Sequence, residues 1–231
     1  MHEDLERLAV VDELDRRSHT TRRRRDKARD AVAEAARAIT DAEASKASAA
    51  SSLAENKTTE RALQRRLDEG RRHQGNALRL LETGQGDPEG AQRQLDKSTA
   101  LIDELETELL EVLEVQDTRQ AALSAASATL EHATAKHAEL AGALPAIEAE
   151  AEAALSADAE ARQPVFAQLP GEVQTRYDSF RAKGRWAVAT IDKGACNACY
   201  QVVQQQHISD IRRGIVKPCM GCHRWLVLDD G

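Results

Sequence analysis

Residues 83–89 read Thr-Gly-Gln-Gly-Asp-Pro-Glu, and they interrupt two long stretches of helical sequence pattern. The two glycines can end a helix because glycine adopts positive φ without strain. Asp87 can cap a following helix, and Pro88 suits its first turn. The stretch therefore predicts a helical hairpin with its tip near residues 84–87.

Apolar residues on both sides of this turn follow the spacing of a coiled coil. After the turn, a 3-4 spacing runs without a phase break from Leu95 to Ala154. Before it, a weaker seam runs from Leu14 to Leu81, with polar residues at many seam positions. Such spacing specifies a left-handed coiled coil, so we expect two long antiparallel helices. Pro145 removes one backbone donor, and we expect a kink in the second helix near it.

The rest of the chain has a different composition. All six aromatic residues and all four cysteines lie after residue 165, whereas 35 of the 41 alanines lie in the first 161 residues. Aromatic residues contribute large buried areas to globular cores, so a stretch of 165 residues without any is not expected to form one globular domain. Its richness in Ala, Glu, Arg and Leu fits long helices, and the composition predicts a mainly α protein. We expect a coiled-coil hairpin at residues 1–162 and a compact domain with its helical junction at residues 163–231.

Two Cys-x-x-Cys pairs in the compact domain have the spacing of a metal site. Cys196-Asn-Ala-Cys199 and Cys219-Met-Gly-Cys222 are separated by 19 residues. Each such turn points two sulfurs at one point, and two turns complete the tetrahedron that zinc prefers. The pattern predicts a zinc ribbon holding one structural zinc ion. An iron centre with the same ligands and paired redox disulfides are the alternatives.

Three histidines are further candidate ligands. His207 lies between the two cysteine pairs and His223 follows the last cysteine directly, but four cysteines already complete a tetrahedron. His137 lies on the coiled-coil seam, where a polar residue sets helix register. We therefore expect all three to be non-ligands.

Charge is distributed unevenly along the chain. The formal net charge is −10 in residues 1–165 and +3 in residues 166–231, so a polyanion would bind at the C-terminal end. The charged start of the chain leads into no apolar core, and we expect no secretory signal. No apolar run approaches the roughly 18 to 20 residues that span a bilayer. We expect a cytoplasmic protein, a compartment where paired cysteines are more often metal ligands than disulfides.

Several motifs together resemble a bacterial family. Leu169-Pro170 is followed by Tyr177 and Phe180, then by residues 188–199, and finally by Cys-Met-Gly-Cys-His-Arg-Trp-Leu at residues 219–226. This arrangement is similar to the C4-type zinc-ribbon proteins with an N-terminal coiled-coil hairpin. The resemblance covers the whole chain, and its specific part is residues 169–227.

The resemblance carries expectations about function. It implies that Cys196, Cys199, Cys219 and Cys222 hold zinc. Members of the family are described as nucleic-acid-binding proteins, and some as adaptors or chaperones for transcription factors and for flagellar or type III export components. The family often has glycine where this chain has His223. If that position needs positive φ, histidine costs roughly 1 to 2 kcal/mol there.

Basic residues are concentrated in the predicted ribbon, interleaved with Trp186, Tyr200 and Trp225. One hypothesis is that this region binds RNA or single-stranded nucleic acid, with cations on phosphates and a ring stacked on bases. The alternative is that both tryptophans pack in the ribbon core and the charges keep the domain soluble. The candidate nucleic-acid contacts are Arg181, Lys183, Arg185, Arg212, Arg213, Lys217 and Arg224.

A second hypothesis is an adaptor or chaperone whose rod or hairpin base binds a protein, with the ribbon as a structural or docking module. The run Arg22–Arg25 at that base is typical of nucleic-acid-binding segments. Folding the hairpin about residue 85 places the run near Glu148, Glu150 and Glu152, so cross-helix charge pairing explains it more simply. A composite basic surface at the hairpin base is the other interpretation.

Motifs of common enzymes are absent from the sequence. There is no Gly-rich phosphate loop, no nucleophile elbow and no His-Glu-x-x-His. The many carboxylates of the rod are expected to be solvated helix faces. We therefore expect a non-enzymatic protein with no small-molecule substrate and no membrane partner.

Overall fold

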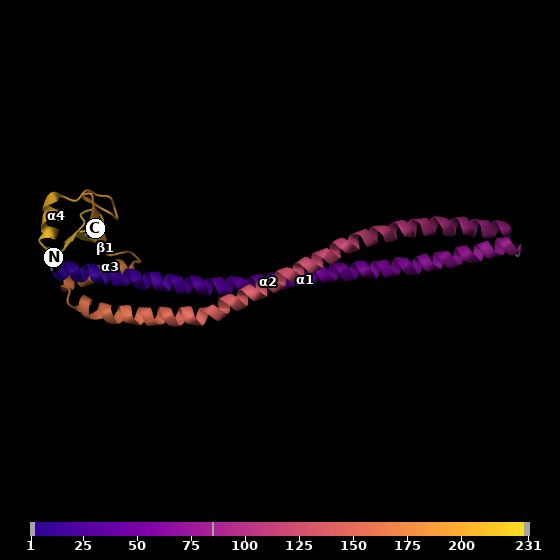
Figure 1. Ribbon diagram of the computed structural model, residues 1–231. Coiled ribbons are helices and arrows are strands. Elements are labelled where there is room, and N and C mark those ends of the chain that lie inside the picture. Colours follow the sequence, from indigo (N-terminus) through magenta and orange to yellow (C-terminus); the bar gives the residue numbers. More distant parts are fainter. Residues whose placement is uncertain (1–2, 85, 229–231) are drawn as a thin grey trace. The chain divides into compact units, whose positions relative to one another are not determined.

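The computed structural model describes residues 3–84 and 86–228, and it contains two long helices packed against each other as a hairpin (Figure 1). Helix α1 spans Glu3–Thr83 and helix α2 spans Pro88–Ala167. A small C-terminal sheet with the four cysteines follows. This architecture confirms the predicted mainly α fold class.

The connection between α1 and α2 has the chemistry expected of a tight turn. Gly84 and Gly86 have φ values of 67° and 94°, which glycine adopts without a Cβ clash. The carboxylate of Asp87 accepts a hydrogen bond from the backbone N–H of Glu89 at 3.1 Å. Asp87 thus caps the start of α2. Gln85 lies outside the described residues.

Residues 31–141 form one compact unit in which the two helices pack along a narrow seam. Its main apolar cluster contains Leu63, Leu67, Ile102 and Leu105, all at predicted seam positions. Many other seam positions are alanine, which buries little area per layer, so stability must accumulate along the length of the seam.

A polar layer interrupts this seam. Asn56 donates a hydrogen bond from its side-chain amide to the carbonyl of Val112 at 3.2 Å. Arg119 donates to the carbonyl of Ser52 at 2.7 Å. Polar seam residues of this kind favour one register over its alternatives.

A second unit combines residues 3–30 with residues 142–228. In it, α2 continues through Pro145 and Pro164 and ends at Ala167, and helix α3 spans Gly171–Ala182. The domain boundary at residue 162 and the kink near Pro145 stay predictions. The start of α1 belongs to the same unit as the C-terminal sheet.

The sheet has four short strands in the order β2-β1-β4-β3. Strands β1 and β4 are parallel, and the two outer pairs are antiparallel. The elements are β1 (Val188–Asp192), β2 (Ala195–Cys196), helix α4 (Gln205–Arg212), β3 (Lys217–Pro218) and β4 (Trp225–Leu228).

Each face of this sheet is covered, and α1 contributes to both sides. Leu5 packs in one apolar cluster with Ala189 and Leu226. Leu8 packs in another cluster with Val188 and Trp225. Neighbouring residues of β1 and of β4 thus enter opposite clusters, as the alternation of a strand requires. The first turns of α1 therefore form part of the ribbon core.

Carboxylates of α1 and α2 join the helices of this unit. Asp15 accepts hydrogen bonds from Arg162 and from the hydroxyl of Tyr177, each at 2.8 Å. Asp158, which is 2% exposed, accepts hydrogen bonds from Arg17 at 2.7 Å and from Ser18 at 3.1 Å. The Arg17 hydrogen bond lowers the pKa of Asp158 below its usual value.

Replacing Asp158 with Asn is expected to reduce the free energy of unfolding by about 1–3 kcal/mol near neutral pH, because Arg17 and Ser18 lose a charged acceptor. The folded pKa of Asp158 lies below the unfolded value. The carboxylate therefore contributes fully above about pH 4, and its contribution is lost as pH falls through the folded pKa. The difference between variant and wild type should shrink in acid.

Urea unfolding followed by the fluorescence of Trp186 and Trp225 measures this difference, because both tryptophans lie in the same unit as Asp158. Asp26→Asn, at an exposed position of α1, is the matched control. A penalty for Asp158→Asn that stays constant from about pH 7 to about pH 3 would contradict the assignment.

Candidate metal centre and basic hollow

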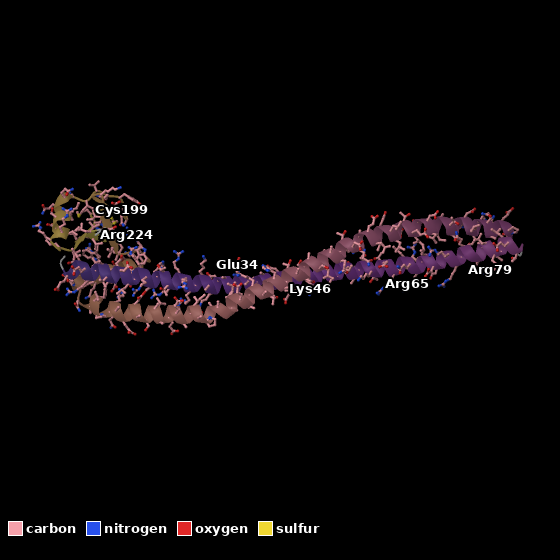
Figure 2. All side chains as sticks on the ribbon, in the orientation of Figure 1. Glu34, Lys46, Arg65, Arg79, Cys199 and Arg224 are labelled. Carbon is pink, nitrogen blue, oxygen red and sulfur yellow. The ribbon has the colours of Figure 1, made fainter. Side chains whose placement is uncertain are left out.

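The four cysteines converge on one point in the ribbon. Cys196 ends β2, Cys219 follows β3, and each has its partner cysteine three residues later. All four sulfurs lie within 4.8 Å of one another. Figure 2 labels Cys199 in this region, together with Arg224 beside the second pair.

The sulfur–sulfur distances fit a tetrahedral metal site. The Sγ atoms of Cys196 and Cys222 are 3.8 Å apart, and those of Cys199 and Cys219 are 3.6 Å apart. A tetrahedron with metal–sulfur bonds of about 2.3 Å has edges of about 3.8 Å. A disulfide needs sulfurs only about 2.05 Å apart. The cluster has the dimensions of a metal site and contains no disulfide.

Backbone N–H groups point at the sulfurs. Those of Ala198 and Cys199 donate to Cys196, that of Gln201 donates to Cys199, and that of Arg224 donates to Cys222. Such donors favour thiolate over thiol because they stabilise the charged form. The backbone of the two turns therefore stabilises the thiolate form of the cysteines.

Burial and hydrogen bonds shift the pKa values of Cys196 and Cys222 in opposite directions. Burial raises the pKa of Cys196 to about 12, although two backbone N–H groups oppose the shift. Burial also acts to raise the pKa of Cys222, but hydrogen bonds from the backbone and side chain of Arg224 help to lower it to about 7. Four thiolates this close need a cation to compensate their charge, and a metal ion bound among them would supply it.

The residue after each cysteine pair has a left-handed backbone. Tyr200 has φ 62° and His223 has φ 61°, although neither is glycine. The position of His223 therefore needs positive φ, as the resemblance led us to consider. At Gly221 the end of the Gln201 side chain occupies the space where a Cβ would stand, so a larger residue there would displace Gln201.

The histidines lie outside the sulfur cluster. Among the described residues, the group that can hold a metal ion consists of the four cysteines. His207 is a half-buried residue of α4, and His137 is a half-buried residue of α2. His223 follows the second cysteine pair and lines a neighbouring hollow. Their expected role as non-ligands agrees with this placement.

The structure separates the seven candidate nucleic-acid contacts into groups. Arg181 pairs with Asp15 at 3.5 Å, and Arg224 donates to the carbonyl of Trp186 at 3.0 Å. Both side chains thus serve intramolecular contacts. Arg213 and Lys217 both pair with Asp210, at 2.7 Å and 3.7 Å. Arg212 is an exposed residue at the end of α4.

The last two candidates, Lys183 and Arg185, lie together at a hollow of about 390 Å³. The hollow is next to the second cysteine pair and has no acidic residue in its lining. Its lining residues are Arg176, Ser179, Phe180, Lys183, Arg185, Cys222 and His223. We call it the basic hollow. It brings cationic side chains from α3 and the following loop beside the metal centre.

Sequence reasoning missed Arg176 as part of this site. The sequence signal was the spacing of Arg176 and Phe180, which are four residues apart in α3 and therefore share one face of it. Lys183 directly follows the helix as its C-cap. The guanidinium of Arg176 also lies over the ring of Trp225, 4.9 Å from its centroid. This contact holds α3 against the sheet.

Both tryptophans have intramolecular partners. Trp225 is 3% exposed and belongs to the apolar core. Trp186 is half-buried, and the guanidinium carbons of Arg16 and Arg181 lie 4.5 Å and 4.4 Å from its ring centroid. Trp186 therefore contacts α1 and α3 through its faces.

The arginine run near the start of α1 has partners on α2. Arg24 pairs with Glu150 at 3.2 Å, and Arg29 pairs with Glu148 at 2.6 Å. Arg25 pairs with its neighbour Asp26. Cross-helix pairing thus accounts for Arg24 within this run.

Solved structures of bacterial proteins share this fold. CT398 from Chlamydia trachomatis matches with a TM-score of 0.69 and 16% identity, over 98% of each chain. A protein from Mycobacterium smegmatis matches with a TM-score of 0.61 and 16% identity, over 99% of this chain and 100% of that one. The HP0958 protein from Helicobacter pylori matches with a TM-score of 0.57 and 17% identity, over 99% and 97%.

At these identities the likeness establishes the fold alone. No family model matches the chain, and no curated protein matches it in sequence. Within the described residues, no helix has the length and apolar character needed to cross a membrane.

Metal content is the direct test of the cysteine cluster. The purified protein is expected to carry one metal ion per chain, and Cys196→Ser or Cys222→Ser should remove most of it, because three sulfurs cannot close the tetrahedron. Elemental analysis by mass spectrometry measures the content. His207→Ala is the matched control and should keep the metal. Full retention in both cysteine variants would show that the cluster is not the ligand set.

Proposed function

We propose that this chain is a cytoplasmic, non-enzymatic zinc-ribbon protein that binds single-stranded nucleic acid, RNA or DNA, at the basic hollow. The observation that carries the proposal is the charge of the hollow. Arg176, Lys183, Arg185 and His223 line it beside the ring of Phe180, with no carboxylate among the lining residues.

Zinc is the metal that the ligand set favours. Four thiolates at tetrahedral spacing match its preferred coordination, and they leave no open position for water or substrate. The ion would be structural, fixing the two cysteine turns and thereby the position of His223. Cys196, Cys199, Cys219 and Cys222 would be its ligands.

The basic residues of the hollow differ from the other basic residues of the ribbon in how many acidic partners they have. Within the described part of the chain, Lys183 and Arg185 form no ion pair, whereas Arg213 and Lys217 share Asp210. Arg176 is 4.0 Å from Glu172, a long and largely exposed pair that contributes little. Lys183 and Arg185, which are both exposed, are therefore available to phosphates, which supply most of the affinity in nucleic-acid binding.

Replacing Arg176, Lys183 and Arg185 together with Ala is expected to weaken single-strand binding by at least about tenfold, because several phosphate contacts are lost. The slope of log affinity against log salt should also become less steep. Fluorescence anisotropy with labelled oligo-U and oligo-dT, over a salt series, measures both. The matched control replaces Arg65, Arg72 and Arg79 of α1, which carry the same charge, with Ala. Equal losses in the two variants would refute a specific site.

The variant His223→Gly distinguishes a lost contact with nucleic acid from a loss of protein stability. Glycine relieves the strained backbone at φ 61°, so this variant should unfold at a higher temperature. The same change removes a side chain of the basic hollow, and single-strand binding should weaken. A stabilised variant with undiminished affinity would exclude His223 from the binding surface.

A second candidate function is a protein adaptor that uses the rod. Several large apolar side chains of the unit at residues 31–141 are exposed: Leu78, Leu80, Leu101, Leu110, Leu113 and Val115. Leu110 and Leu113 are three residues apart on α2 and therefore neighbours on its surface. Clustered exposed apolar residues are typical of protein-binding surfaces.

The adaptor hypothesis predicts a stoichiometric protein partner that co-purifies with the chain after nuclease treatment. Leu110→Glu combined with Leu113→Glu should abolish its capture, since both changes place charge on the apolar surface. Val10→Glu, at an exposed apolar position of the other unit, is the control. Capture that the double variant does not reduce would rule out this surface.

A further inference from the structure

The six aromatic rings of the chain differ in what covers them. Tyr177 is fully buried against Phe166, with ring centroids 5.7 Å apart, and Trp225 is in the core. Arg185 lies over the ring of Phe180, and two guanidiniums lie over Trp186. Tyr200 is the exception, because it is 82% exposed. Its ring is the aromatic surface that the fold leaves available.

The backbone presents this ring from a fixed point. Tyr200 has φ 62°, a conformation that glycine adopts at less cost, and its N–H donates to the carbonyl of Cys196 at 2.8 Å. It directly follows Cys199, whose sulfur belongs to the metal cluster. Strained residues of this kind concentrate at functional sites. The cysteine turn thus fixes the backbone from which the ring projects into solvent.

The stretch of chain around Tyr200 has an unusual composition. Residues 194–209 contain no Asp, Glu, Lys or Arg, in a chain of which 31% is charged. Two further exposed apolar residues belong to the two cysteine turns: Val202, two residues after Tyr200 and 78% exposed, and Met220, between Cys219 and Cys222 and 66% exposed. The side chain of Gln201 lies against Gly221, across the two turns. The two cysteine turns thus expose one ring, two apolar side chains and several amides.

This surface fits a nucleobase better than a protein. Three side chains fall short of the apolar core of a standard protein interface, which buries on the order of 800 Å² on each partner. A base needs only one exposed ring for stacking, and neighbouring amides can pair with its edge. The sulfurs of Cys199 and Cys222 belong to one cluster, so the turn bearing Tyr200 adjoins the turn bearing His223 of the basic hollow.

We propose that Tyr200 is the base-stacking residue for the single strand whose phosphates bind in the basic hollow. This inference rests on the proposed nucleic-acid function and adds the residue that selects unpaired bases. Bases in a duplex are stacked on each other, so their faces are closed to Tyr200. The site would therefore prefer single strands to duplexes.

The test compares Tyr200→Ala, Tyr200→Phe and Tyr200→Leu in the full-length, metal-loaded protein. The probes are labelled oligo-U of about eight nucleotides and a strand of equal length with abasic sugars, measured by anisotropy. Tyr200→Ala should weaken oligo-U binding about 5- to 100-fold, and Tyr200→Phe should stay within about twofold of wild type. The preference of wild type for oligo-U over the abasic strand should vanish in Tyr200→Ala. Metal content serves as the check on folding.

Three results would overturn the inference. If Tyr200→Ala binds oligo-U like wild type while the triple hollow variant fails, Tyr200 is not the stacking residue and the proposed function stands. If Tyr200→Leu binds as well as Tyr200→Phe, the contact is a general apolar one, as a protein partner would make. If wild type binds neither strand, the proposed function fails and the inference fails with it.

Discussion

The carboxylate of Asp15 joins three helices. It accepts hydrogen bonds from Arg162 on α2 and from the Tyr177 hydroxyl on α3, and it pairs with Arg181 at the end of α3. Burial and the charge of Asp15 raise the pKa of Tyr177, so its hydroxyl remains a donor. These bonds fix α3 against the start of α1. Since α3 supplies Arg176 and Lys183 follows its end directly, the basic hollow depends on this one half-buried carboxylate.

The cysteine cluster is the second constraint, and it acts on the other side of the hollow. The ribbon has short strands and a small apolar core in which Cys196 and Cys219 are themselves members. A core of this size gains little from apolar burial alone, so closure of the sulfur tetrahedron by a metal ion would supply much of its stability. Cys222 belongs to the cluster and also lines the hollow with His223. Metal binding and anion binding would thus share one turn.

The sequence predicted those features that local chemistry specifies. Two glycines followed by Asp87 and Pro88 indicate a turn, and an unbroken 3-4 spacing indicates a coiled coil. The two Cys-x-x-Cys pairs similarly indicated the cluster. The roles of the basic residues were harder to foresee, because counting charges does not reveal their partners. Asp210 engages Arg213 and Lys217, which the sequence suggested as phosphate contacts.

Tertiary packing determines the features that sequence reasoning missed. Leu5 and Leu8 precede the predicted seam, which begins at Leu14, and they pack in the ribbon core. Arg176 enters the hollow because α3 lies beside the second cysteine turn. Tyr200 combines a left-handed backbone with an exposed ring. Residue type and spacing do not specify such placements.

Photocrosslinking tests the central claim, that single-stranded nucleic acid binds the ribbon beside the metal centre. A 4-thiouridine oligonucleotide would be irradiated with the full-length, zinc-loaded protein, and the crosslinked peptides mapped by mass spectrometry. We predict adducts within residues 176–185 and 199–224. Adducts confined to residues 31–141, or none at oligonucleotide concentrations that saturate other single-strand-binding proteins, would contradict the claim.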